Sequence, residues 1–407
     1  MKRYALFVGL ALAAAPSAEA QLTMQMGNGW NFTFAGNVNA FYTYGRTQTQ
    51  PTNAAGAAVG NTVDADYSGV GTGLLPAFAT FAAKGKEGNT DLGVHFGFAP
   101  QVSAGNNVAS MFGAQAAGAQ IDMRQVFATI GGEWGTILAG KELGLFQRGN
   151  LVNDMTLFGV GPTGGFRGTG LGRIGYGYLY TDFRGQFTYS TAAGKPGQFS
   201  IGIFEPIAVG NFTSMQLPRV EFEATYGGKA GENGKYNVYV SGAAQTAKTA
   251  ASGGTSLTSA GIAGGFKADF SGFSIGAAGF YANGMGSLFM GNLGGQTVAN
   301  DPAVGGTFLG NNNARTSFGY YGQVGYQPKD SKVSFGISYG SNQVDLATGE
   351  NNQNQLKKRT SITGLITYQV TKSYRFVFDG TYFDNKNQAG TTTLKGYQGS
   401  AGIMLFY

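Results

Sequence analysis

Few residues of this chain are of the types that carry out covalent or metal chemistry. His95 is the only histidine, and there is no cysteine. A disulfide framework, a thiol nucleophile and a cysteine-based metal site are therefore impossible, and a histidine-based metal site lacks a second imidazole. His95 could serve a Ser–His hydrolase only if the fold brought a serine and an orienting partner beside it. We expect no metal and no cofactor.

Two acids and one glycine-rich motif are the other chemical candidates. Glu221 and Glu223 lie two residues apart, so on a strand they share a face, next to Arg219. Paired acids can hydrolyse glycosides, but on a strand wall they are more simply explained as wall charges. Residues 159–164 match G-x-G-x-x-G, yet Pro162 and further glycines follow where a dinucleotide site needs a helix. These patterns indicate a loop and a non-enzymatic protein.

The composition points to a chain with much of its surface in lipid. Glycine accounts for 70 of 407 residues, charged residues for 12% and aromatic residues for 13%. Average proteins have about 7% glycine and about 25% charged residues. Such a chain is a poor candidate for a helical or α/β fold. Its positive charge is spread out, with no basic block suited to nucleic acid.

The N-terminus has the three parts of a secretory signal. Met1-Lys2-Arg3 is positive, residues 4–15 are apolar apart from one glycine, and Ala18-Glu19-Ala20 is a small-x-small cleavage pattern. We expect a signal peptide at 1–20 and a mature chain at 21–407, with the formal charge changing from +6 to +5. The apolar run is too short to span a bilayer, and no later stretch approaches the roughly 18 apolar residues of a membrane helix.

Alternating segments of about ten residues recur along the mature chain. In residues 31–44 aromatic and aliphatic side chains share one parity and polar side chains the other. Period two over this length predicts a strand with one apolar and one wet face. The same pattern puts on the wet, lumen-facing side the polar residues His95, Glu221, Glu223, Arg375 and Asp379.

Long and short connections alternate between these segments. Eight long and seven short ones separate sixteen strands, if the stretch 173–191 contains a single strand at 182–191. Short turns at one end and long loops at the other are typical of bacterial outer-membrane barrels, and about sixteen strands leave an aqueous channel. We therefore predict an all-β fold, a 16-stranded antiparallel transmembrane β-barrel.

The stretch from Arg124 to Lys141 resembles the general (trimeric) porins of Gram-negative outer membranes. An Arg-initiated strand, a Gly132-Glu-Trp-Gly135 turn and a strand ending in Gly-Lys precede the third loop, as in that family. The resemblance implies that the loop at 142–172 folds inward and narrows the pore, with loop acids facing wall cations. The implied constriction residues are Asp154 and Glu142 on the acidic side, and Arg124, Arg184, Arg148, Arg167 and Arg173 on the basic side.

The resemblance also implies a function and partners. We expect a homotrimeric, passive diffusion porin for small hydrophilic solutes and ions, neutral to mildly anion-selective. It would lie among outer-membrane lipid and lipopolysaccharide, with trimer contacts from the first and last strands (Phe32, Phe34 and Ile403). The aromatic C-terminal Tyr407, after alternating apolar positions, resembles the signal read by the barrel-assembly machinery. A substrate-specific channel and a barrel hydrolase remain alternatives.

Overall fold

The computed structural model describes residues 22–407 apart from 28, 101, 103–120, 164–169, 210–211, 251–253, 287–308 and 311–312. The expected signal peptide (1–20), Arg167 and most of the long connection at 283–316 lie outside the described residues.

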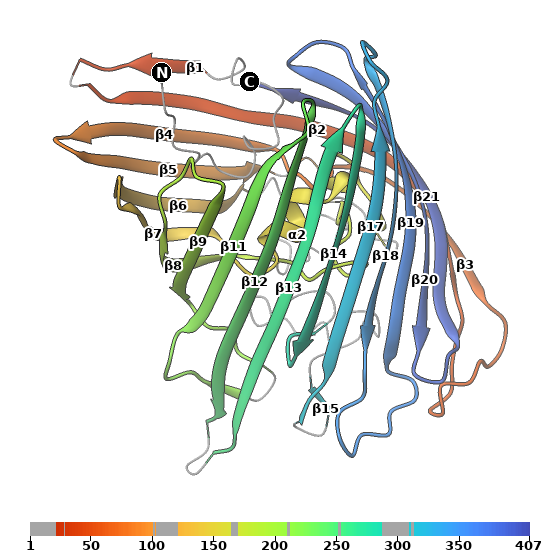
Figure 1. The fold of residues 1–407 in the computed structure, drawn as a ribbon. Coiled ribbons are helices and arrows are strands. Elements are labelled where there is room, and N and C mark those ends of the chain that lie inside the picture. Colours follow the sequence, from red (N-terminus) through yellow and green to blue (C-terminus); the bar gives the residue numbers. More distant parts are fainter. Residues whose placement is uncertain are drawn as a thin grey trace.

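In the described part of the chain, sixteen antiparallel strands close into a barrel (Figure 1). Closure comes from the first strand, which pairs with the last from Asn37↔Phe406 to Thr49↔Leu394. A closed sheet leaves no unpaired edge in lipid, and the predicted fold class is confirmed. The barrel strands are β2 (Asn31–Thr49), β3 (Val63–Gly71) continued by β4 (Phe78–Glu87), β5 (Thr90–Pro100), β6 (Ile121–Gly132), β7 (Gly135–Leu143), β8 (Phe183–Ser190), β9 (Gly197–Phe204), β11 (Arg219–Ala230), β12 (Gly234–Thr249), β13 (Ser256–Phe270), β14 (Phe273–Asn283), β17 (Thr316–Tyr326), β18 (Val333–Val344), β19 (Leu356–Gln369), β20 (Tyr374–Asn387) and β21 (Thr392–Phe406).

The remaining elements are short. They are β1 (Leu22–Gln25), α2 (Arg148–Asn153), the 3-10 helix η3 (Met155–Phe158), β10 (Phe212–Ser214), β15 (Leu309–Gly310) and β16 (Asn313–Ala314). No helix among the described residues is long or apolar enough to cross a bilayer. β1 pairs with the start of β2, from Leu22↔Phe34 to Gln25↔Asn31.

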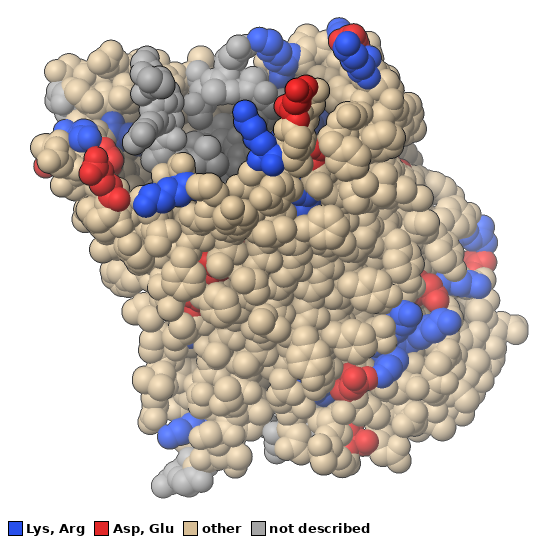
Figure 2. All heavy atoms as spheres, viewed as in Figure 1, with Lys and Arg blue, Asp and Glu red and all other residues tan. Residues whose placement is uncertain are grey.

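The two faces of the wall separate apolar from polar side chains. On β20, Phe376, Phe378 and Tyr382 are 40–48% exposed on the outside, whereas Arg375 and Asp379 are buried inside. On the visible side of the molecule, a wide band with few charges lies between charged side chains at upper left and at lower right (Figure 2). This arrangement suits a bilayer, because an arginine on the lipid face at mid-membrane costs roughly 2–4 kcal/mol.

The second strand is broken, which the alternation did not predict. β3 starts at Val63, about ten residues before the expected strand, and residues 72–77 leave the ladder between β3 and β4. Two asparagines of β2 take over the hydrogen bonds of this gap. Asn37 donates to Pro76 O (3.0 Å), and Asn39 donates to Leu75 O (2.9 Å) and accepts from Gly73 N. Side chains thus replace the missing strand pairing.

The barrel interior contains an apolar core. Inward wall residues such as Phe41, Phe78 and Phe280 are at most 6% exposed and pack with Leu151, Leu157 and other residues that follow β7. Alternation correctly separated the two faces of most strands. It did not predict that part of the inward face is apolar. The glycine-rich wall leaves room inside the barrel for a buried segment, and these inward apolar side chains pack against that segment.

Candidate pore constriction

The segment between β7 and β8, residues 144–182, binds strands on several sides of the barrel; we call it the third-loop segment. It contains α2 and η3 (Figure 1). On one side, Tyr321 of β17 donates to Asn150 O (2.8 Å). Its neighbour Gln323 donates to Asn153 O (2.5 Å) and accepts from Met155 N (2.9 Å). Because side chains of the wall bind backbone of the segment, this part of the segment is fixed in place.

A second set of contacts joins the segment to the last strands. Asp379 of β20 accepts from Val160 N (2.6 Å). Gln398 of β21 donates to Gly161 O and accepts from Thr163 N (3.0 Å). Asp379 is therefore on the inward face, where alternation placed it, but its carboxylate binds the segment rather than standing free.

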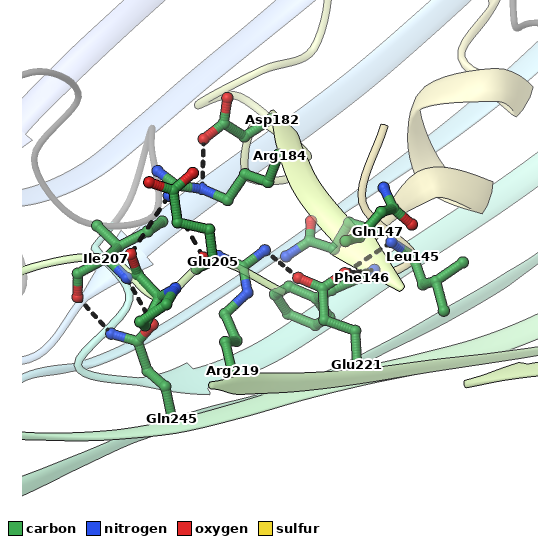
Figure 3. A network of polar contacts seen from close by, with 12 residues as sticks. Leu145, Phe146, Gln147, Asp182, Arg184, Glu205, Ile207, Arg219, Glu221 and Gln245 are labelled. Carbon is green, nitrogen blue, oxygen red and sulfur yellow. Dashed lines mark hydrogen bonds and ion pairs between the residues drawn. The ribbon is translucent and has the colours of Figure 1, made fainter. Parts of the chain in front are cut away.

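The start of the segment is tied to β11 by a buried acid (Figure 3). Glu221 accepts hydrogen bonds from Leu145 N (2.6 Å) and Phe146 N (2.9 Å), and it also pairs with Arg219. Both charged side chains are fully buried. A buried ion pair is tolerable only when further hydrogen bonds satisfy it, and the two backbone N–H groups supply them to Glu221. Nearby, Gln147 accepts from Leu179 N (2.8 Å), which links the two ends of the segment.

Next to Glu221, an ion pair has the reverse of the arrangement that the resemblance implied, which was a loop acid facing a wall cation. The cation, Arg148, is on the segment, and the acid, Glu223, is on the wall. The Arg148 Nε donates to Glu223 at 3.0 Å. The Arg148 side chain is 27% exposed and that of Glu223 is 5% exposed, so only the cation reaches the open part of the lumen.

Asp154 lies inside the segment and binds its two arms together. Its carboxylate accepts from Thr156 N (2.8 Å), from Arg173 N (3.0 Å) and from the Tyr178 hydroxyl (2.9 Å). It is 2% exposed. Asp154, the expected loop acid, therefore has its acceptor capacity used by the segment itself.

Arg173 is also buried rather than open to the lumen. Its guanidinium donates to the Ser338 hydroxyl (2.9 Å) and to Ser361 O (2.9 Å) on β18 and β19. Burial lowers the pKa of Arg173 to about 10, so it remains charged near pH 7. Ser338 also stands in a G-x-S-x-G match at 336–340, but its hydroxyl binds the Arg173 guanidinium. Ser338 is on β18, which does not pair with β5, the strand of His95.

Arg124 reaches the interior by way of a β-bulge. Opposite β5, Gly97 pairs with Gln125 and Phe98 pairs with Met123, so Arg124 is an extra residue on β6. Parity opposite to Phe127 predicts an inward Arg124 only if Phe127 faces lipid, but Phe127 faces inward and stacks on His95 with ring centres 4.9 Å apart. The Arg124 guanidinium binds Asp122 (2.8 Å) and lies 5.7 Å from the centre of the Phe183 ring.

The remaining expected constriction residues are Arg184 and Glu142, which are paired in register across β7 and β8. Arg184 binds Asp182 (2.8 Å; Figure 3). Glu142 accepts from Gln125 (2.8 Å) and from Leu143 N (2.8 Å). His95, on the inward face, has the Gln125 amide (3.3 Å) and the Phe127 ring as its contacts.

Sequence reasoning missed the basic end of the lumen. At the end with the short turns, a cavity of about 1500 Å³ is lined by inward residues of β11, β12 and β13, by the turns near 330 and 371, and by Arg375. Lys229 and Lys235 line it from either side of one short turn. The sequence did contain a signal for this basic cavity, because both lysines have the inward parity of their strands next to the short turn.

The comparisons with known proteins agree with this geometry. The family model for Gram-negative porins matches residues 5–388. The chain belongs to the Gram-negative porin family. No curated protein sequence matches it.

Solved structures share the fold of this porin at low sequence identity. The outer membrane channel DcaP of Acinetobacter baumannii has a TM-score of 0.63 at 13% identity, over 94% of this chain and 99% of that one. An anion-selective porin from Comamonas acidovorans has a TM-score of 0.59 at 12% identity, over 93% of this chain and 100% of that one. Salmonella typhi OmpF, in complex with daunomycin, has a TM-score of 0.51 at 15% identity, over 95% of this chain and 100% of that one. Family and fold together make this porin a passive channel of the outer membrane.

Proposed function

We propose that this porin passes small hydrophilic solutes and ions through a pore whose narrowest part is formed by the third-loop segment. The observation that carries the proposal is the set of hydrogen bonds from the wall to the segment, through Glu221, Tyr321, Gln323, Asp379 and Gln398. A segment fixed on several sides sets the size limit without moving.

The charges around the segment support a pore that is neutral to mildly anion-selective. Arg124, Arg184 and Arg219 are each paired with an acid two residues away. Arg148, which is paired with Glu223, has a larger exposed fraction than any of these three arginines. Selectivity follows the charges that line a pore, and paired charges contribute little. In the Arg148–Glu223 pair the cation is the more exposed partner, so this pair adds a small preference for anions.

The test combines permeation with selectivity. Liposomes containing the purified barrel should swell in small sugars and stop swelling as the sugar size rises. In a salt gradient across a planar bilayer, the reversal potential should have the sign for anions and a magnitude well below the Nernst value. A pore that passes only one sugar with saturation, or that is strongly cation-selective, would contradict the proposal.

We further propose a homotrimer in which the first and last strands form the contact. Phe34 stacks on Phe81 at 5.0 Å and lies 4.9 Å from Tyr407, beside Phe32 and the 41% exposed Ile403. These rings form a continuous apolar surface at the seam of the barrel. The proposal includes removal of 1–20, insertion by the barrel-assembly machinery and contact with lipopolysaccharide. Native mass spectrometry in detergent should give three mature chains.

A further inference from the structure

The cavity at the short-turn end of the lumen, which we call the vestibule, has an excess of positive charge. Seven basic and four acidic residues line its volume of about 1500 Å³, a net charge of +3. One of the acids, Asp154, already binds groups of the third-loop segment. The vestibule therefore presents a net positive charge to a solute.

Three lysines on adjacent strands carry this charge. Lys229 of β11 and Lys235 of β12 are direct cross-strand partners, and Lys267 of β13 pairs with Asn237, two residues from Lys235. Like charges directly opposite each other destabilise a sheet. Among the described residues, Lys235 has one ion pair, with Asp269 at 3.5 Å, and no ion pair involves Lys229 or Lys267. The row therefore lacks its full complement of counter-charge.

On the other side of the vestibule stands Arg375. It is 7% exposed, and its guanidinium lies over the rings of Phe158 (4.7 Å from the ring centre) and Phe406 (5.0 Å). Aromatic rings contact a guanidinium by its face and do not accept its in-plane N–H hydrogen bonds. Its Nε and Nη2 have no hydrogen-bond partner in the described part of the chain. A buried donor without an acceptor is costly, and an anionic ligand would satisfy it.

This situation differs from that of the constriction, where the arginines near β11 are matched with acids. We propose that the vestibule is a binding station for small solutes that carry two or more negative charges, held between the lysine row (Lys229, Lys235 and Lys267) and Arg375. The inference rests on the proposed pore function and adds to it a substrate class and a site. Such solutes would be concentrated at the short-turn mouth before or after they pass the constriction.

The test is block of single channels by inorganic pyrophosphate in 0.1 M KCl, where the Debye length is about 10 Å. Pyrophosphate is added to one chamber and then, after exchange, to the other. The concentration that halves the mean current should be lower from the side of the vestibule, and acetate at the same concentration should not block. For the variant K229Q/K235Q/K267Q, the pyrophosphate concentration that halves the mean current should rise at least about tenfold, because each lysine lost removes a Coulomb attraction.

A matched control removes the same charge from the opposite end of the barrel. K357Q/K358Q/K395Q changes three lysines of β19 and β21 near the long loops. Its block by pyrophosphate should stay within about twofold of the unmodified protein. Equal loss of block in both triple variants, or unchanged block in K229Q/K235Q/K267Q, overturns the binding station while the open current still supports the pore. Absence of any current from folded protein overturns both.

Discussion

The carboxylate of Glu221 accepts the backbone N–H of Leu145 at 2.6 Å, although 76 residues separate the two in the chain. This contact joins the first residues of the third-loop segment to the wall of the barrel. Glu221 also pairs with Arg219 on the same strand, and both side chains are fully buried. The attachment of the segment to β11 therefore depends on this one acid.

Replacing Glu221 with Gln should loosen the segment. The change leaves Arg219 as a buried charge without its partner, which typically costs roughly 3–5 kcal/mol. We expect a lower unfolding temperature and noisier single-channel currents, measured by circular dichroism and bilayer recording. In the double variant E221Q/R219M the unpaired charge is gone, so much of the unfolding temperature should return. If the single and double variants melted together, the pair would not be the anchor.

The ion pair between Arg148 and Glu223 should set the sign of selectivity. Glu223→Gln frees the partly exposed Arg148 and should move the reversal potential toward anions. Arg148→Gln leaves Glu223 as a free acid and should move it toward cations. The two shifts have opposite signs because the same pair is broken from opposite sides. Shifts of the same sign, or none, would show that the pair lies outside the ion path.

Asp154→Asn should separate the two arms of the third-loop segment. In the unmodified protein one carboxylate oxygen of Asp154 accepts from Arg173 N and from the Tyr178 hydroxyl. In the variant an amide N–H₂, which is a donor, can stand in place of that oxygen. An unsatisfied buried donor costs roughly 1–3 kcal/mol, so the segment should become accessible to protease in the folded barrel. Asn153→Ala, which removes the bond to Gly149 O and leaves the Asp154 carboxylate in place, is the control and should resist cleavage. Equal cleavage of both variants would contradict this role of Asp154.

The outward face of β20 should not tolerate charge. Phe378 is 47% exposed near the middle of the strand. Phe378→Arg should lower the unfolding free energy by roughly 2–4 kcal/mol in a bilayer, because the charge must lie in hydrocarbon. Phe378→Leu should change it far less. Urea titration of barrels folded into vesicles measures both, and an arginine variant as stable as the leucine variant would place Phe378 outside the lipid.

Much of the fold was predictable because lipid and lumen impose the same period on every strand. Sixteen strands follow from the alternation, as at 219–226 and 374–382, together with the order of long and short connections. The single strand expected in 173–191 is β8. The gap at 72–77 was not predictable, since its hydrogen bonds come from Asn37 and Asn39, more than thirty residues away.

The site was only partly predictable. Inward parity predicted Glu221, Arg375 and Asp379 on the lumen side, and all three are buried. Parity does not say which partner each side chain finds. Arg124 shows the limit most clearly, because the bulge at β6 changes the parity of the residues after it. The reversed charges of Arg148 and Glu223 depend on how the segment crosses the barrel, and nothing local in the sequence contains that path.

The most direct test of the whole account is the single-channel current of the purified, folded mature chain in a planar lipid bilayer. A porin with a fixed third-loop segment should insert in discrete steps. Each step should carry a steady current proportional to voltage at low voltage and to salt concentration. A folded barrel that enters the bilayer, as shown by protease protection, and carries no current would contradict the account.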